Sequence, residues 1–390
     1  MISDAEIKAA VAIGHDLSAH LPPIDVSRRI SAVQGRAFDG DGAQDAVLVT
    51  DLVNVRYLTG FTGSAGMLWL TASGAVFITD GRYAERAATE LGDVNCFAHI
   101  EVRRSVVDQR NLISELISSM RVVRLGLESA SVSWATAEEY RGLLANVAGG
   151  ELVPTVDMVE QFRQTKDTAE LARLARASAI ADAALAEVLP ILRRRPTEIE
   201  LSRALESAMA DLGSDGPSFD TIIASGPNAS RPHHEPSRRV IEEGDEVICD
   251  FGATIEGYHS DMTRTIYVGE PAMKQKRHFG VVRAAQNAGV YAVRSGMGGK
   301  DIDDACRNVI TEAGWGDFFV HGTGHGSGLL IHEAPWAGPT STSTLKVADI
   351  LTVEPGVYLP AEGGVRIEDS LVVCEHGSVY LTRAPYDLIV

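Results

Sequence analysis

The 390-residue sequence has few cysteines and no long apolar segment. Its four cysteines are scattered, and no two of them have the C-x-x-C spacing of zinc and redox motifs. Scattered cysteines of this kind indicate free thiols in a reducing compartment. No stretch approaches the roughly 18 apolar residues of a membrane-spanning helix, and the first residues lack the apolar core of a secretory signal. We therefore expect a cytoplasmic protein with no membrane partner.

Positive charge is also scarce. The chain has 35 Lys and Arg residues against 53 Asp and Glu residues, which gives a formal net charge of −18. Such an excess of negative charge repels nucleic acids and anionic membranes. Neither is expected as a partner.

Several common catalytic motifs are missing as well. The chain has no G-x-S-x-G elbow, no Walker loop and no G-x-G-x-x-G segment. His332 and Glu333 are not followed by the second histidine of an H-E-x-x-H motif. These absences argue against a nucleophilic serine, a helical zinc motif and a nucleotide-binding loop.

The length and the hydrophobic fraction of 45% favour two domains with well-buried cores. In the first domain, short apolar runs alternate with segments of helical composition. The runs that predict strands are 46–50, 67–71, 75–79 and 122–127. This alternation predicts an α/β domain over residues 1–162.

Residues 163–390 are predicted to form an α+β domain. Two capping boxes, the pattern that opens a helix, occur at its start: Asp167 with Glu170, then Thr197 with Glu200. Helices are expected at about 168–192, 198–212, 278–295 and 301–313. The apolar segments between them predict an antiparallel sheet with helices covering one face.

Two segments in this second domain repeat the spacing Asp, four residues, carboxylate, one residue, glycine. The repeated carboxylates are Asp250 and Glu354, and a second carboxylate follows each of them, at Asp261 and Glu368. Two hairpins with a carboxylate on both strands could thus face one another across a pseudo-twofold axis. A coincidence between two glycine-containing hairpins is the alternative.

Chemistry favours a metal site at these acids. Four buried carboxylates would repel one another and raise their own pKa values, and two divalent cations would remove that cost. An oxygen-rich set with one imidazole suits manganese, cobalt or iron. Bridging carboxylates hold two metals at a separation that activates a shared water. Solvated turns are the alternative, but they leave the apolar flanks of the acids unexplained.

The glycine-rich stretch between the two hairpins contains His321, His325 and His332. With this stretch included, the sequence resembles the pita-bread metallopeptidases, most closely their Xaa-Pro aminopeptidase and prolidase branch. The segments that carry the resemblance are 250–265, 321–335, 354–356 and 366–368, with 54–61 and 79–83 resembling the creatinase-type N-terminal domain. The resemblance implies a pseudo-twofold pita-bread fold for the second domain.

The resemblance also implies which residues do the chemistry. Two divalent metal ions, manganese first, with cobalt, iron or zinc as alternatives, would be bound by Asp250, Asp261, His325, Glu354 and Glu368. Substrate contacts would come from His233, His321, His332 and Arg366, and the catalytic residues would be His233, His332 and Glu354. His234 is the alternative to His233 as the histidine that contacts the substrate. In a further interpretation, His233 is a surface-loop histidine with no role in the site. Arg366 could instead be a charge partner of the nearby acids.

The sequence therefore predicts a Xaa-Pro aminopeptidase, in which a hydroxide bridging two metals attacks the peptide bond before a penultimate proline. Short peptides with proline second are the expected substrates. The resemblance further implies that the first domain narrows the entrance to the site and favours a homodimer. The alternatives are a Xaa-Pro dipeptidase (prolidase), a metal-free creatinase-like amidinohydrolase and a non-catalytic peptide-binding module. The filled ligand positions disfavour the last two.

Overall fold

The computed structural model describes residues 2–40 and 43–390. The chain divides into an N-terminal unit, Pro23–Arg163, and a C-terminal unit, which combines Gln164–Val390 with the residues up to Pro22. The predicted division into 1–162 and 163–390 differs from this one in the placement of the first 22 residues.

The N-terminal unit contains a six-stranded mixed sheet in the order β4-β3-β2-β1-β5-β6. Its strands are β1 (Ala46–Val49), β2 (Gly66–Leu70), β3 (Ala75–Asp80), β4 (His99–Arg103), β5 (Arg124–Glu128) and β6 (Glu151–Thr155). Its helices are α2 (Arg29–Ala37), α3 (Leu52–Thr59), α4 (Ala84–Asp93), α5 (Val106–Met120) and α6 (Trp134–Leu144), and α7 (Glu160–Gln164) lies at its end. β2 and β3, which cover two of the predicted strands, pair as an antiparallel hairpin. The expected α/β class of this part is confirmed.

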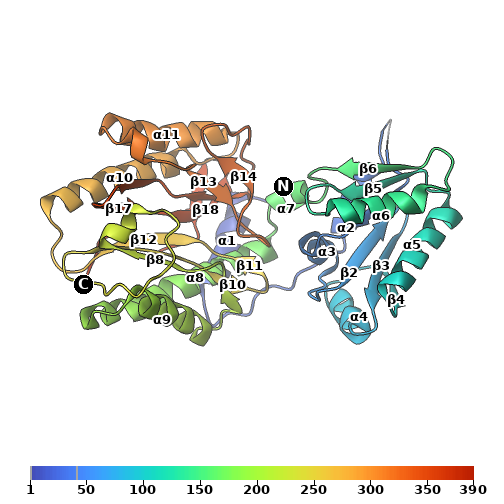
Figure 1. Ribbon diagram of the computed structural model, residues 1–390, viewed down its shortest axis with the longest axis horizontal. Coiled ribbons are helices and arrows are strands. Elements are labelled where there is room, and N and C mark those ends of the chain that lie inside the picture. Colours follow the sequence, from blue (N-terminus) through green and yellow to red (C-terminus); the bar gives the residue numbers. More distant parts are fainter. Residues whose placement is uncertain (1, 41–42) are drawn as a thin grey trace. The chain divides into compact units, whose positions relative to one another are not determined.

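The C-terminal unit has long helices on either side of its strands. The helices are α1 (Asp4–His15), α8 (Thr168–Val188), α9 (Glu198–Asp211), α10 (Met273–Ala292) and α11 (Gly299–Glu312), with short 3₁₀ helices η1 (Leu189–Arg194), η2 (Gly226–Ser230) and η3 (Gly316–Phe318). Figure 1 shows the strands lying between the α8–α9 pair and the α10–α11 pair. Both predicted capping boxes are present, so α8 and α9 begin where the sequence predicts.

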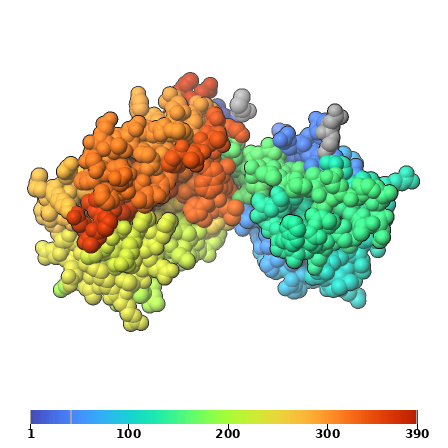
Figure 2. Space-filling view, turned by 45° about the horizontal axis from the view of Figure 1, so that its top comes forward, coloured from blue at the N-terminus to red at the C-terminus, as the bar shows by residue number. Residues whose placement is uncertain are grey.

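The strands of the C-terminal unit form two similar halves. The first half contains β7 (Gly216–Pro217), β8 (Ile222–Ser225), β9 (Glu246–Phe251), β10 (Ala253–Ile255), β11 (Tyr258–His259) and β12 (Met262–Tyr267). The second contains β13 (Gly324–Gly326), β14 (Glu333–Ala337), β15 (Ile350–Val353), β16 (Gly356–Leu359), β17 (Gly363–Arg366), β18 (Asp369–Cys374) and β19 (Gly377–Tyr380). The C-terminal strand β20 (Leu388–Ile389) pairs back with β12. Figure 2 shows the first half in green to yellow and the second in orange to red.

Each half is built around its own antiparallel pair and its own core. β9 pairs with β12, and β15 pairs with β18. One apolar core joins α8 and α9 to β9 and β12, and a second joins α10 and α11 to β15 and β18. The predicted repeat therefore corresponds to two equivalent helix-covered hairpins.

Helix α1 explains why the first residues belong to the C-terminal unit. It packs along α8 so closely that a Cβ at Gly14 would lie 2.3 Å from the carbonyl oxygen of Ala172. The Arg176 guanidinium donates to the carbonyl oxygens of Gly14 at 2.8 Å and Asp16 at 2.6 Å, which caps the end of α1. In the described part of the chain, no helix combines the length and the apolar character needed to cross a bilayer.

Candidate metal centre

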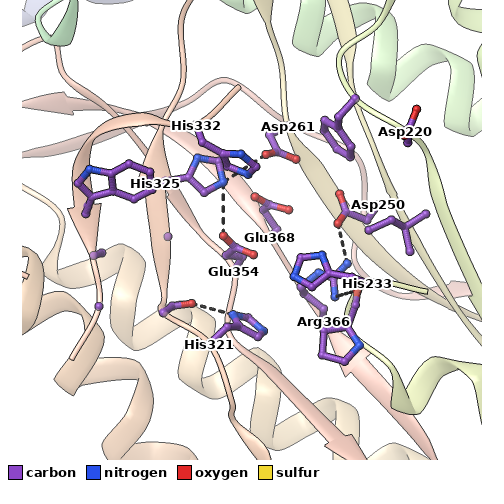
Figure 3. A pocket seen from close by; sticks show the side chains of 18 of the residues that line it. Asp220, His233, Asp250, Asp261, His321, His325, His332, Glu354, Arg366 and Glu368 are labelled. Carbon is purple, nitrogen blue, oxygen red and sulfur yellow. Dashed lines mark hydrogen bonds and ion pairs between the residues drawn. The ribbon is translucent and has the colours of Figure 1, made fainter. Parts of the chain in front are cut away.

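A cavity of about 1050 Å³ lies in the C-terminal unit, and all the candidate residues predicted from the sequence line it. They come from both halves of the unit and are labelled in Figure 3. They are His233, Asp250, Asp261, His321, His325, His332, Glu354, Arg366 and Glu368. The fold thus brings residues more than 100 positions apart in the chain into one cavity.

The two hairpins position the carboxylates. In the first, Asp250 lies in β9 opposite Thr263 of β12, and Asp261 immediately precedes β12. In the second, Glu354 immediately follows β15, and Glu368 immediately precedes β18. Both hairpins therefore present their two carboxylates at the same end of the paired strands.

The imidazole of His325 lies among these acids (Figure 3). Its Nε2 is 3.5 Å from a carboxylate oxygen of Asp261 and 3.5 Å from one of Glu354. Its Nδ1 lies 3.0 Å from the carbonyl oxygen of Gly326. Because a carbonyl only accepts, Nδ1 carries the proton and the lone pair of Nε2 faces the carboxylates. Ligand atoms of Asp261, His325 and Glu368 all lie within 4.8 Å of one another.

The described residues compensate the charge of these acids only in part. Burial, together with the charges of Asp250 and Glu354, raises the pKa of Asp261 well above its usual range. Burial raises the pKa of Glu354 to about 8. Burial and the neighbouring acids also raise the pKa of Glu368 well above its usual range. Burial lowers the pKa of His325 to about 4, so this imidazole is neutral at pH 7.

Two buried oxygens of the cluster, Asp250 Oδ1 and Glu368 Oε1, have no hydrogen-bond partner among the described residues. A buried carboxylate oxygen without a donor is costly, and a bound cation would satisfy it. Carboxylates with one neutral imidazole are also a donor set that divalent first-row metals accept. The residues present therefore fit a divalent-metal site.

A row of hydrogen-bonded side chains runs from His321 to Asp250, two residues that line the cavity. The Arg366 guanidinium donates to Asp250 Oδ2 at 2.6 Å, to the Tyr358 hydroxyl at 2.8 Å and to the Thr263 hydroxyl at 3.1 Å. His321 Nδ1 donates to the carbonyl of the next residue at 2.8 Å, so Nε2 accepts from the Tyr358 hydroxyl at 2.9 Å. Both ring nitrogens of His321 are thus engaged within the protein. Arg366 thus forms an ion pair with Asp250, which is the alternative role that the sequence analysis gave it.

The structure separates the two adjacent histidines. His233 is exposed and lines the cavity. His234 is buried, and its Nε2 lies 2.8 Å from the Glu198 carboxylate. His332 is also exposed to the cavity, with its ring 4.4 Å from that of His325. The substrate side of the cavity therefore presents His233 and His332.

Sequence reasoning missed Tyr358 and Thr263. Tyr358 joins His321 to Arg366, and the Thr263 hydroxyl donates to Glu368 at 2.7 Å. Thr263 could have been found from the sequence, because it lies two residues after the predicted metal ligand Asp261. Tyr358 had a weaker one, since it lies in the strand that follows Glu354.

We expect the stability conferred by metal binding to increase with pH. The folded-state pKa values of Asp261, Glu354 and Glu368 are raised above their unfolded values. In the metal-free protein, ionising these groups therefore costs stability as the pH rises from about 4.5 through about 8, the pKa of Glu354. Bound cations remove the cost, and deprotonated ligands bind them more tightly.

The measurement is the difference in Tm between manganese-loaded and metal-free protein. It should be larger at pH 8 than at pH 5, by on the order of 5 °C. A difference that is constant or shrinks with rising pH would contradict this account of the cluster.

The fold and the cavity define a two-domain protein with a carboxylate-rich site that suits divalent metals. Residues 172–375 match the model of the metallopeptidase family M24, and residues 36–165 match the model of the creatinase/prolidase N-terminal domain. The chain belongs to metallopeptidase family M24 and is an enzyme of that family. The family implies divalent metal ions.

Curated relatives and solved structures are similar to this chain over nearly its whole length. The chain is 40% identical over 346 residues to a Bacillus subtilis protein named "Uncharacterized peptidase YqhT", covering 89% of this chain and 96% of that one. The solved structure of a Xaa-Pro dipeptidase from Bacillus anthracis has a TM-score of 0.87 at 37% identity, covering 94% and 100%. That of an X-Pro aminopeptidase from Thermotoga maritima has a TM-score of 0.81 at 32% identity, covering 89% and 98%.

Proposed function

We propose that this metallopeptidase is a Xaa-Pro aminopeptidase, which removes an N-terminal residue that precedes proline. The observation that carries the proposal is the shared cavity, in which four carboxylates and His325 face the exposed imidazoles of His233 and His332. Relatives named Xaa-Pro dipeptidase and X-Pro aminopeptidase support the choice of peptide bond. A Xaa-Pro dipeptidase is the second candidate, favoured by the Bacillus anthracis structure.

Five residues would hold two divalent cations: Asp250, Asp261, His325, Glu354 and Glu368. When bound, such ions supply Lewis acidity, which polarises a carbonyl and lowers the pKa of water. We propose manganese as the metal. The family match and the donor set support a metal site, and the identity of the metal is part of the proposal.

The chain's own residues would manage the protons and the orientation. Glu354 takes a proton from the attacking water and passes it to the proline nitrogen as the C–N bond breaks. His233 donates a hydrogen bond to the carbonyl oxygen as negative charge develops on it. His332, beside His325, contacts the substrate. Arg366 holds Asp250 in place through their ion pair. The imide nitrogen before proline carries no hydrogen, so selectivity must come from the shape of the ring.

The test of the substrate class is a panel of three peptides: Leu-Pro, Leu-Pro-Gly and Leu-Ala. We expect release of leucine from both proline peptides, with kcat/KM for Leu-Pro-Gly at least equal to that for Leu-Pro. Leu-Ala should be slower by about 10²-fold, because it does not fill a pocket shaped for the ring. Hydrolysis of Leu-Pro alone would select the dipeptidase. Equal rates for Leu-Ala, or no hydrolysis of any peptide, would contradict the proposal.

We also propose a cytoplasmic homodimer, on the basis of the cysteine usage and the family resemblance. Sedimentation velocity of the full chain tests the assembly. A monomer at micromolar concentration would contradict it.

A further inference from the structure

Glu198 neither lines the cavity nor belongs to the predicted site. It is the first residue of α9, and its side chain is fully buried. A buried carboxylate is expensive unless donors surround it. Around Glu198 the donors all come from one continuous segment, residues 225–237, which runs from the end of β8 to just beyond His233.

The donors contact both carboxylate oxygens. Oε1 accepts from the backbone N–H and the hydroxyl of Ser225, at 2.8 and 2.7 Å. Oε2 accepts from the backbone N–H and the hydroxyl of Ser237, at 3.0 and 2.6 Å, and from His234 Nε2 at 2.8 Å. The Asn228 amide donates to both oxygens, at 3.0 and 3.3 Å. Burial opposes ionisation, but these hydrogen bonds outweigh it and lower the pKa of Glu198 to about 2. The side chain is therefore an anion at neutral pH.

The anion also fixes the state of His234. Since an ionised carboxylate only accepts, Nε2 of His234 must carry a proton and donate. This bond turns the His234 side chain inward, and His233, the preceding residue, is exposed to the cavity. On the cavity side, the Arg366 guanidinium donates to the carbonyl oxygen of Pro232 at 3.3 Å. His233 thus lies between two anchored neighbours, one held by Glu198 and one by Arg366.

We propose that Glu198 is a positioning residue, which sets the reactivity of His233 by holding the segment that carries it. The inference rests on the proposed function, because it needs His233 to act on the transition state. A displacement of about 1 Å at a catalytic group can cost up to about 10²-fold in rate. An anchor at the base of the segment therefore affects turnover without touching substrate or metal.

The test is a double-mutant cycle on Leu-Pro-Gly hydrolysis with metal-loaded protein. Glu198→Gln keeps the shape but replaces one accepting oxygen with an NH₂ group that faces existing donors. We expect kcat to fall about 10-fold while KM and metal content stay within about twofold. His233→Ala should lower kcat about 10²-fold. The double variant should be no slower than His233→Ala alone, because Glu198 acts only through His233.

Two further variants keep the test decisive. Glu200→Gln is the control. Glu200 belongs to the same first turn of α9 but is exposed, and its carboxylate accepts from the backbone N–H and the hydroxyl of Thr197, so kcat should be unchanged. If Glu198→Gln fails to fold, Ser237→Ala replaces it. That variant removes one hydrogen-bond donor to the Glu198 carboxylate. As a single substitution it should lower kcat about 3-fold, and when added to His233→Ala it should leave kcat unchanged.

The possible outcomes distinguish a failure of the positioning role of Glu198 from a failure of the proposed function. If the effects of Glu198→Gln and His233→Ala multiply, or if Glu198→Gln acts through KM or metal loss, the positioning role is wrong while the proposed function stands. If His233→Ala has no effect on kcat, both the role of His233 and this inference are wrong. If no proline peptide is hydrolysed by the wild type, the proposed function itself fails.

Discussion

Asp261→Ala should lower turnover by roughly 10³-fold or more, equivalent to about 4 kcal/mol of transition-state stabilisation. Asp261 is 4% exposed, and its carboxylate lies with His325 and Glu368 in one cluster of ligand atoms. Removing it deletes one of the five residues that would hold the metal ions under the proposed function. The purified variant should therefore contain fewer than two metal ions per chain, as measured by inductively coupled plasma mass spectrometry.

The same variant should have an unusual stability when metal is absent. Besides burial, the charges of Asp250 and Glu354 raise the pKa of Asp261, and the charge of Asp261 raises the pKa of Glu368. Deleting the Asp261 carboxylate therefore relieves like-charge repulsion. At pH 8 the metal-free variant should unfold at a higher temperature than the metal-free wild type. This result would separate loss of ligands from misfolding.

Asp220→Asn is the matched control for metal content. Asp220 also lines the cavity, but it is exposed and is not one of the predicted ligands. It should keep two metal ions per chain. Asp261→Ala protein that retains both metals would show that the cluster has been assigned incorrectly.

Much of this site could be predicted because its signals are local. The capping boxes at Asp167 and Thr197 fixed where two helices begin, since a cap depends on residues three positions apart. The repeated spacing around Asp250 and Glu354 predicted two equivalent hairpins for a similar reason. Alternation within a strand and a turn between strands are properties of short segments.

What the sequence did not predict depends on contacts between distant segments. Helix α1 belongs to the C-terminal unit because Arg176 caps its end and Gly14 permits close packing on α8. Those partners are about 160 residues apart, and no local pattern relates them. His233 and His234 were indistinguishable for the same reason: Glu198, which turns His234 inward, comes from another element.

The most direct test of the account is to remove the metal and restore it. The full-length protein is stripped with a chelator, metal content is verified by mass spectrometry, and hydrolysis of Leu-Pro-Gly is then measured with and without added Mn²⁺. Since the ligand acids and His325 fit a divalent-metal site, stripped protein should retain less than about 1% of its turnover. Turnover should return as two equivalents of Mn²⁺ bind per chain, and Tm should rise with it. Full turnover in protein shown to be metal-free would contradict the account and favour a metal-independent, creatinase-like reaction.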